Sequence, residues 1–221
     1  MNSNYNLLNE KYPFYNVNGF ETLEYQKDTT TLVNVLSASM RASLKNVVFP
    51  TKITSYATGV FEDCSNLKIE MAITESISSI GNNAFKNSAI TFTSVDLSGC
   101  SSYPSVGTNA FTGTTVKKLI VNDNGVKVNS NYGISSEFYP FYGVKGFTTL
   151  EYKEGKTFAY NVLSSSMRKT LTEVTVSSSV TQIGSSAFDD CVLLERISLP
   201  WAAKYDREKT FRNCKAVITY Y

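Results

Sequence analysis

The sequence predicts an α/β solenoid built from stacked repeats, and three observations lead to this fold class. A Phe or Met marker recurs along the chain at intervals of 21 to 30 residues. Around most markers, apolar residues follow at steps of three and end in an alternating apolar pair, as in "AFDDCVLLERISL" (187–199). In addition, one long stretch of the chain occurs twice. A period in the twenties is typical of solenoids, whose repeats bury their apolar faces only by stacking on one another.

The marker and the residue three positions later form the compact part of each repeat. The markers are Phe14, Met40, Phe61, Phe85, Phe111, Phe141, Met167, Phe188 and Phe211. Three repeats carry a cysteine at the second position, namely Cys64, Cys191 and Cys214. We expect the Phe residues and these cysteines to form a continuous apolar ladder inside the stack, with the cysteines as small, buried, free thiols. A disulfide between Cys191 and Cys214 is the alternative, because adjacent rungs lie about 4.8 Å apart.

The alternating pair that ends each repeat predicts a short strand. Ile197 and Leu199 share one face of such a strand and point into the core, because successive side chains of a strand point to opposite faces. The triplet spacing before them is the bend that leads into the strand. Each repeat therefore contains one strand and one short helical or turn segment on the opposite side.

A longer segment of the chain, which spans several of the short repeats, is itself duplicated. Residues 12–71 align with residues 139–199, so that "YPFYNVNGFETLEY" corresponds to "YPFYGVKGFTTLEY" at an offset of 127 positions. Inserts rich in Ser, Asn and Gly at 98–107 and 122–138 predict surface loops. We therefore expect residues 1–221 to form a single domain of about eight to nine repeats.

Composition excludes several function classes. The chain contains no His, which removes Ser-His-Asp and Cys-His catalysis and every His-ligated metal site. Its four cysteines form no C-x-x-C pair, and its net charge is +2 without a basic block. We expect no cofactor, no metal, no nucleic-acid partner and no membrane span, and we find no secretion signal near residue 1.

The pattern "SVTQIGSSAFDDCVLLERISLP" (179–200) resembles the BspA-type leucine-rich repeat. Residues 53–71, 77–97 and 106–121 match the same pattern in part, and the resemblance covers about nine-tenths of the chain. It implies a right-handed stack with a parallel β-sheet on one side. It also implies a cell-surface or secreted protein, bacterial in the first instance, that takes part in adhesion and host-protein binding and has no enzymatic activity.

The outward-facing centre of each strand supplies the first candidate ligand-binding residues. In successive repeats this position holds an acid four times, at Glu24, Glu70, Asp96 and Glu151. We expect Glu70 and Asp96 to lie on neighbouring rungs, where like charges repel. Such acids are consistent with a cation site, with a carboxylate pair on a carbohydrate-binding face, or simply with a solvated strand row relieved by Lys68 and Lys118.

Tyrosines in and beside the inserts supply the second set of candidates. Tyr103 lies in the first insert, and Tyr132, Tyr139 and Tyr142 cluster around the second. Exposed Tyr is a common contact residue at protein interfaces, although these residues can equally cover the convex side of the stack.

Three functions remain open on these grounds. The first is a non-catalytic binding or adhesion scaffold that recognises a host protein or glycan. The second is a carbohydrate-active enzyme that uses strand-borne carboxylates. The third is a passive structural stalk.

The strand-like end "VITYY" has an apolar face that no later repeat in this sequence covers. We expect either a longer array or self-association of two copies through this C-terminal edge.

Overall fold

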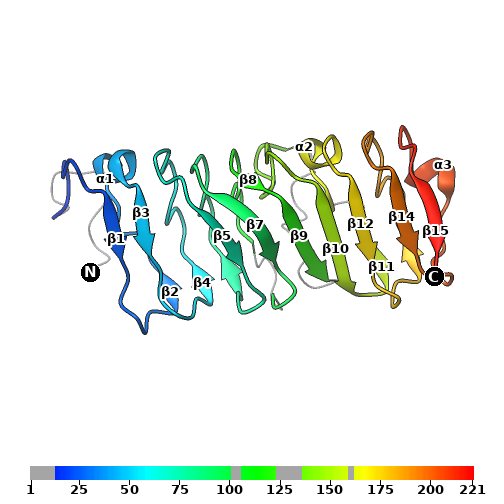
Figure 1. Ribbon diagram of the computed structural model, residues 1–221, viewed down its shortest axis with the longest axis horizontal. Coiled ribbons are helices and arrows are strands. Elements are labelled where there is room, and N and C mark those ends of the chain that lie inside the picture. Colours follow the sequence, from blue (N-terminus) through cyan, green and yellow to red (C-terminus); the bar gives the residue numbers. More distant parts are fainter. Residues whose placement is uncertain (1–12, 101–105, 123–135, 159–161) are drawn as a thin grey trace.

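The computed structural model describes residues 13–100, 106–122, 136–158 and 162–221. Figure 1 shows the described residues as an elongated stack, with β1 near one end, β15 near the other and the strands side by side across its length. Every strand pairing in the described residues is parallel. The chain therefore folds as a parallel-sheet solenoid with little helix, as the repeat period predicted.

The front of the stack carries two sheets. A two-stranded sheet joins β1 (Thr22–Glu24) to β3 (Asn46–Val48). The main sheet follows it with the strand order β15-β14-β12-β10-β9-β7-β5, and β8 pairs with β7. Its strands are β5 (Glu70–Ile73), β7 (Thr91–Asp96), β8 (Thr115–Val116), β9 (Lys118–Asn122), β10 (Thr149–Glu154), β12 (Glu173–Val176), β14 (Arg196–Leu199) and β15 (Val217–Tyr220).

Shorter elements form the rest of each turn. One small sheet has the order β2-β4-β6, from β2 (Thr31–Leu32), β4 (Ser55–Tyr56) and β6 (Ser79–Ile80). Another joins β11 (Thr157–Phe158) to β13 (Gln182–Ile183). The helices are α1 (Ala38–Ser43), α2 (Ser165–Arg168) and α3 (Arg207–Thr210). A Ser or Asp side chain caps the N-terminus of each helix by accepting a backbone N–H.

An aromatic ladder forms the centre of the core. The ring centroids of Phe61, Phe85, Phe111 and Phe141 follow one another at 6.1, 5.3 and 4.9 Å. A second run, from Phe158 through Phe188 to Phe211, has spacings of 5.0 and 5.2 Å. Phe188 thus stacks on Phe158 of β11 and not on the preceding marker Met167, although Met167 is itself fully buried.

A tight turn follows each marker, and its conformation depends on particular residues. Two positions after each Phe marker stands a residue with positive φ: Asn16, Asp63, Asn87, Gly113, Gly143, Asp190 or Asn213. Asn, Asp and Gly tolerate this left-handed conformation better than other residues do. The turns also bind one another, because the N–H of Asp63 donates to the Lys86 carbonyl and that of Asp190 to the Arg212 carbonyl, both at 2.8 Å.

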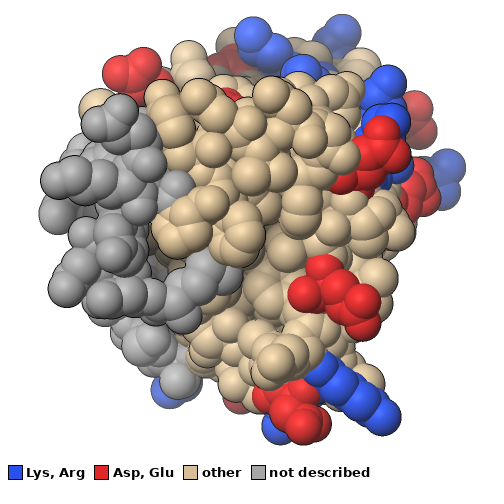
Figure 2. Space-filling view, turned by 90° about the vertical axis from the view of Figure 1, so that its left-hand side faces the viewer, with Lys and Arg blue, Asp and Glu red and all other residues tan. Residues whose placement is uncertain are grey.

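Phe14 departs from the ladder that the spacing predicted. Its side chain is 42% exposed, whereas its counterpart Phe141 is fully buried. Phe14 lies in the outermost described turn, where a described repeat covers only one side. Figure 2 looks onto this end of the stack, whose centre consists of uncharged residues while charged side chains gather mainly along one side.

The two predicted inserts fall partly outside the described residues, namely at 101–105 and 123–135. Where the first insert is described, its boundary differs from the prediction. Val106 is fully buried and forms a parallel bridge with Ile80, and Cys100 is 1% exposed. Both residues therefore belong to the core.

Candidate functional site

The front face of the main sheet brings the strand centres into one row. The register places Asp96 beside Ile120, Ile120 beside Glu151, and Glu151 beside Thr175. Thr175 is followed by Ser198 and then Thr219. In the separate sheet at the other end, Glu24 lies beside Val48. The strands thus hold these side chains in a fixed order along the length of the stack.

Glu70 does not belong to this row. It pairs with Thr91 at the start of β7, and the register shifts by one residue between Met71 and Ala72. The expected repulsion between Glu70 and Asp96 on neighbouring rungs was therefore wrong. The cause is the apolar alternation of β5, in which Ile69, Met71 and Ile73 point inward, so that Glu70 stands one position out of phase with the other strand centres.

Asp96 also differs from its prediction, because it is only 8% exposed. Lys153 Nζ lies 2.8 Å from one carboxylate oxygen, and the Ser98 N–H and hydroxyl donate to the other at 2.9 and 2.6 Å. Burial alone would raise the pKa of Asp96, but these hydrogen bonds and the Lys153 charge bring it below its ordinary value. Asp96 therefore stays ionised and holds Lys153 in place.

Lysines pair with two of the other candidate acids, Glu151 and Glu70. Lys118 Nζ lies 2.6 Å from a Glu151 carboxylate oxygen, and Lys117 Nζ lies 3.2 Å from one of Glu70. Lys153 also reaches Glu75, at 3.6 Å, and its hydrogen bond with Asp96 raises the pKa of its own ammonium group. Among the residues that the structure describes, no group of three or more Cys, Asp or Glu side chains is placed to hold a metal ion.

The tyrosine candidates divide into three cases. Tyr139 is 1% exposed and donates its hydroxyl hydrogen bond to the Val162 carbonyl at 3.1 Å, so the expectation of an exposed contact residue was wrong there. Burial raises the pKa of its phenol. Tyr142 is 39% exposed and remains available on the surface. Tyr103 and Tyr132 lie outside the described residues.

The cysteines at the ladder position are free thiols in the core. Cys64 and Cys191 are fully buried, and Cys214 is half-buried at the last turn. Burial raises the pKa of the Cys64 and Cys191 thiols to about 12. The thiolate is the reactive form of cysteine, so burial and the raised pKa favour a packing role for Cys64 and Cys191.

Two buried arginines are the main residues that the sequence interpretation missed. Arg41 and Arg168 follow the Met markers of α1 and α2 and are 9% and 4% exposed. Arg168 donates to the carbonyls of Leu163, Ser186 and Asp189 at 3.1, 2.9 and 2.8 Å. Arg41 donates in the same way to the carbonyls of Leu36, Gly59 and Glu62. The repeated "SMR" at both positions was the available signal.

Each arginine joins its own turn to the next turn of the stack. Carbonyl oxygens at the turn ends need hydrogen-bond donors when they are buried, and one guanidinium supplies several of them in a fixed plane. Burial lowers the pKa of Arg168, while the thiol and acids around it oppose that shift. The Met-marked repeats therefore substitute a polar clamp for part of the aromatic stacking.

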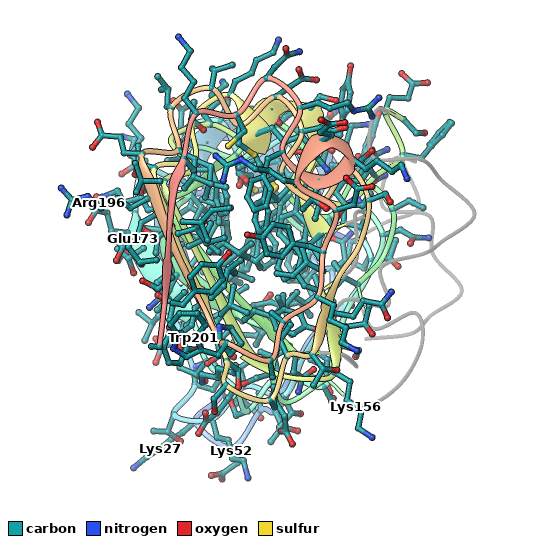
Figure 3. All side chains as sticks on the ribbon, turned by 90° about the vertical axis from the view of Figure 1, so that its right-hand side faces the viewer. Lys27, Lys52, Lys156, Glu173, Arg196 and Trp201 are labelled. Carbon is teal, nitrogen blue, oxygen red and sulfur yellow. The ribbon has the colours of Figure 1, made fainter. Side chains whose placement is uncertain are left out.

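The front face of the second copy is open and mixed in charge. Figure 3 shows Glu173 and Arg196 extending outward from β12 and β14 on this side of the molecule. The register makes these two residues neighbours. In the described part of the chain, no helix is long and apolar enough to cross a membrane.

One known family matches most of this chain. The family described as BspA type leucine rich repeat region matches residues 8–117, 35–139 and 139–220, with six copies of its repeat. A search of curated proteins finds no match.

Two solved structures are similar over 90% of this chain. One is a leucine rich cell surface protein from Faecalibacterium prausnitzii, with 19% identity and a TM-score of 0.33. The other is a leucine-rich repeat protein from Bacteroides ovatus, with 15% identity and a TM-score of 0.28. This chain covers 59% of the first protein and 74% of the second.

Proposed function

Because the chain belongs to the BspA-type leucine-rich repeat family, we propose that it acts as a non-catalytic binding scaffold of a cell-surface or secreted protein. The partner is a protein or a glycan, and the front face of the main sheet receives it. The observation that carries this proposal is the ordered row of strand centres, in which hydrogen-bonded strands hold polar side chains at fixed spacing. Such a preorganised surface loses little conformational entropy on binding.

The charge pattern of the face favours recognition of a polar partner. Ion pairs between Lys118 and Glu151 and between Lys117 and Glu70 are accessible to water, so they add little to stability. They do place charges of both signs at defined positions, and complementary charge gives an interface its specificity and its association rate. We therefore keep Glu24, Glu70 and Glu151 as candidate contact residues and assign Asp96 the role of positioning Lys153.

A carbohydrate-active enzyme is the weaker alternative. Acid–base hydrolysis of glycosides needs two carboxyl groups facing one substrate, with the pKa of the acid raised. Here Glu70 and Glu151 are each paired with a different lysine, and the pKa of Asp96 is lowered. A passive stalk is the remaining alternative and is distinguished by the experiment below.

The experiment is a binding screen of the purified chain on a glycan array and on a panel of extracellular-matrix proteins. The test variant reverses three front-face acids together, as Glu24→Lys, Glu70→Lys and Glu151→Lys. The matched control reverses three exposed acids elsewhere, as Asp28→Lys, Glu195→Lys and Glu208→Lys, and thus changes the net charge equally. We expect both variants to fold and only the first to lose the partner.

Equal binding by both variants would assign the partner to another surface. A deletion of residues 122–138 then tests the second insert and the neighbouring Tyr142. The complete absence of a partner in the screen would favour the stalk.

A further inference from the structure

The front of the stack is interrupted at one step of the first copy. β3 and β5 form no pairing with each other, although they lie on consecutive turns. Their counterparts in the second copy, β12 and β14, pair directly, with Glu173 beside Arg196 and Val174 beside Ile197. On the other side of the same two turns, β4 and β6 remain paired. The two turns are therefore held together at the back and open at the front.

The sequence of the first copy explains this opening. Pro50 stands where the second copy has Ser177, but the Ser177 N–H donates back to the Tyr152 carbonyl of β10 at 2.8 Å, so this proline affects the step from β1 to β3 and not the break. The break follows instead from the phase of β5. In the second copy, Val174 of β12 lies beside the buried Ile197 of β14. The corresponding residues of the first copy are the buried Val47 and Glu70, so the same register would place Glu70 beside Val47. Since a carboxylate cannot take that apolar place, β5 keeps the opposite phase.

An apolar groove of about 280 Å³ lies at this break. Partly buried Phe49, Ile53 and Met71 form its walls, and the buried residues Tyr56, Ile73 and Ile77 contribute its floor. Pockets for drug-sized ligands are larger, at roughly 300–1,000 Å³. The groove is therefore better matched to one large side chain of a partner than to a whole small molecule.

The one charged residue in the lining of the groove is positive. Lys52 belongs to its lining, which contains no acid, and Lys52 has no salt-bridge partner among the described residues. The acids nearest in sequence, Glu70 and Glu75, are engaged by Lys117 and Lys153. The Thr51 hydroxyl donates to the Lys27 carbonyl at 3.4 Å, so a second lysine lies on the adjacent turn. Figure 3 shows Lys27 and Lys52 extending outward from the same edge of the molecule.

From this groove and its charge we propose that the break between β3 and β5 docks an extended acidic segment of a partner protein. One large apolar side chain of that segment enters the groove between Phe49 and Met71. Its flanking carboxylates lie beside Lys52 and Lys27, and its main chain follows the edge of β5 that has no strand partner among the described residues. Addition of an extended peptide to a sheet edge, with a pocket for one side chain, is a common mode of peptide recognition.

This site is separate from the front-face row and does not depend on the function proposed above. The experiment measures fluorescence anisotropy of a labelled peptide of sequence EDFVED titrated with the full chain. Two control peptides replace the Phe with Ser or every acid with Lys. We expect the parent peptide to bind at least tenfold more tightly than either control, and its affinity to fall as salt rises.

Variants of the chain locate the binding. Lys52→Glu, at an exposed position, is expected to weaken binding of the parent peptide at least tenfold. Met71→Trp fills the groove and is expected to weaken binding by a similar factor. Lys169→Glu is the matched control, since it makes the same charge change at an exposed site on another turn. We expect its affinity for the parent peptide to stay within twofold of the wild-type affinity.

Three outcomes would overturn the proposal. One is equal binding of the parent peptide and its Ser control. Another is equal weakening by Lys52→Glu and Lys169→Glu. The third is that laurate binds at Met71 while the parent peptide does not, because the groove would then receive a lipid chain.

Discussion

The first and second copies of the duplicated block place corresponding residues in different environments. Phe141 packs at 4.9 Å from Phe111 in the core, while the corresponding Phe14 is 42% exposed. β12 and β14 continue the main sheet, while β3 and β5 do not pair. Both copies nevertheless keep the buried Met and Arg of their short helices. The two copies therefore share their arginine clamps and differ at the outer end of the ladder and at one step of the front sheet.

This difference shows what holds a repeat stack together. The pairing of β4 with β6 and the hydrogen bonds from Arg41 to the Gly59 and Glu62 carbonyls persist across the break, because they lie away from the front strands. Sheet continuity at the front depends on the phase of apolar alternation, which differs in β5 at Glu70.

The largest expected effect compares the two copies at one position. Phe141→Ala should lower the free energy of unfolding by about 3–5 kcal/mol, because it removes a fully buried ring from the ladder. Phe14→Ala should cost less than about 1 kcal/mol, because surface substitutions seldom cost more. Urea denaturation of the two variants checks this, and similar losses would show that both ends of the duplication are equally packed.

A smaller effect concerns the ion pair that joins the second copy to the segment before it. Lys153 belongs to the second copy and holds Asp96, which lies between the two copies, whereas the counterpart of Lys153 in the first copy is Gln26. Asp96→Asn should cost about 1.5–3 kcal/mol at neutral pH, the usual contribution of a hydrogen bond to a charged group. Since the fold lowers the pKa of Asp96, this stabilisation is present above the ordinary Asp value of about 4 and is lost as pH falls through the lowered value.

Denaturation curves at several pH values test this linkage. We expect the difference in unfolding free energy between the wild type and Asp96→Asn to shrink below about pH 4. A difference that stayed constant down to pH 2 would show that Asp96 contributes by packing and not by its charge.

The smallest effect transfers the proline of the first copy into the second. Ser177→Pro removes the N–H that donates to Tyr152 and should cost about 1 kcal/mol, which is roughly 2–4 °C in melting temperature for a chain of this size. The reverse change, Pro50→Ser, should leave the break in place, because the N–H that it restores faces Tyr25 and Glu70 still prevents pairing of β3 with β5. A rise in melting temperature for Pro50→Ser larger than the loss for Ser177→Pro would mean that the proline does contribute to the break.

The sequence predicted the ladder because its signal is local and repeated. Six of the seven Phe markers are buried, and the spacing after each marker is short enough to read along the chain. The same reasoning placed Phe14 in the ladder, because spacing carries no information on whether a neighbouring turn covers a residue. The sequence pattern therefore predicted the position of each marker within its repeat, but not which markers are covered by a neighbouring turn.

The residues that were missed have partners far along the chain. Arg168 was not singled out because an arginine usually lies at the surface, and its carbonyl partners Ser186 and Asp189 belong to the next turn. Asp96 was expected at the surface because its partner Lys153 stands 57 positions away. The break could be predicted in part, since Glu70 in the out-of-phase β5 is visible in the sequence, but the groove depends on how far the two turns separate in space.

Amide hydrogen exchange, followed by mass spectrometry of peptides from both copies, tests the central claim most directly. The claim is that corresponding strands form a continuous ladder in the second copy and an open front in the first. Segments 46–49 and 69–73 are to be compared with segments 173–176 and 196–200. We predict that the first pair exchanges at least about tenfold faster, because amides without a strand partner open at lower free energy. Equal protection of the two pairs would contradict the account.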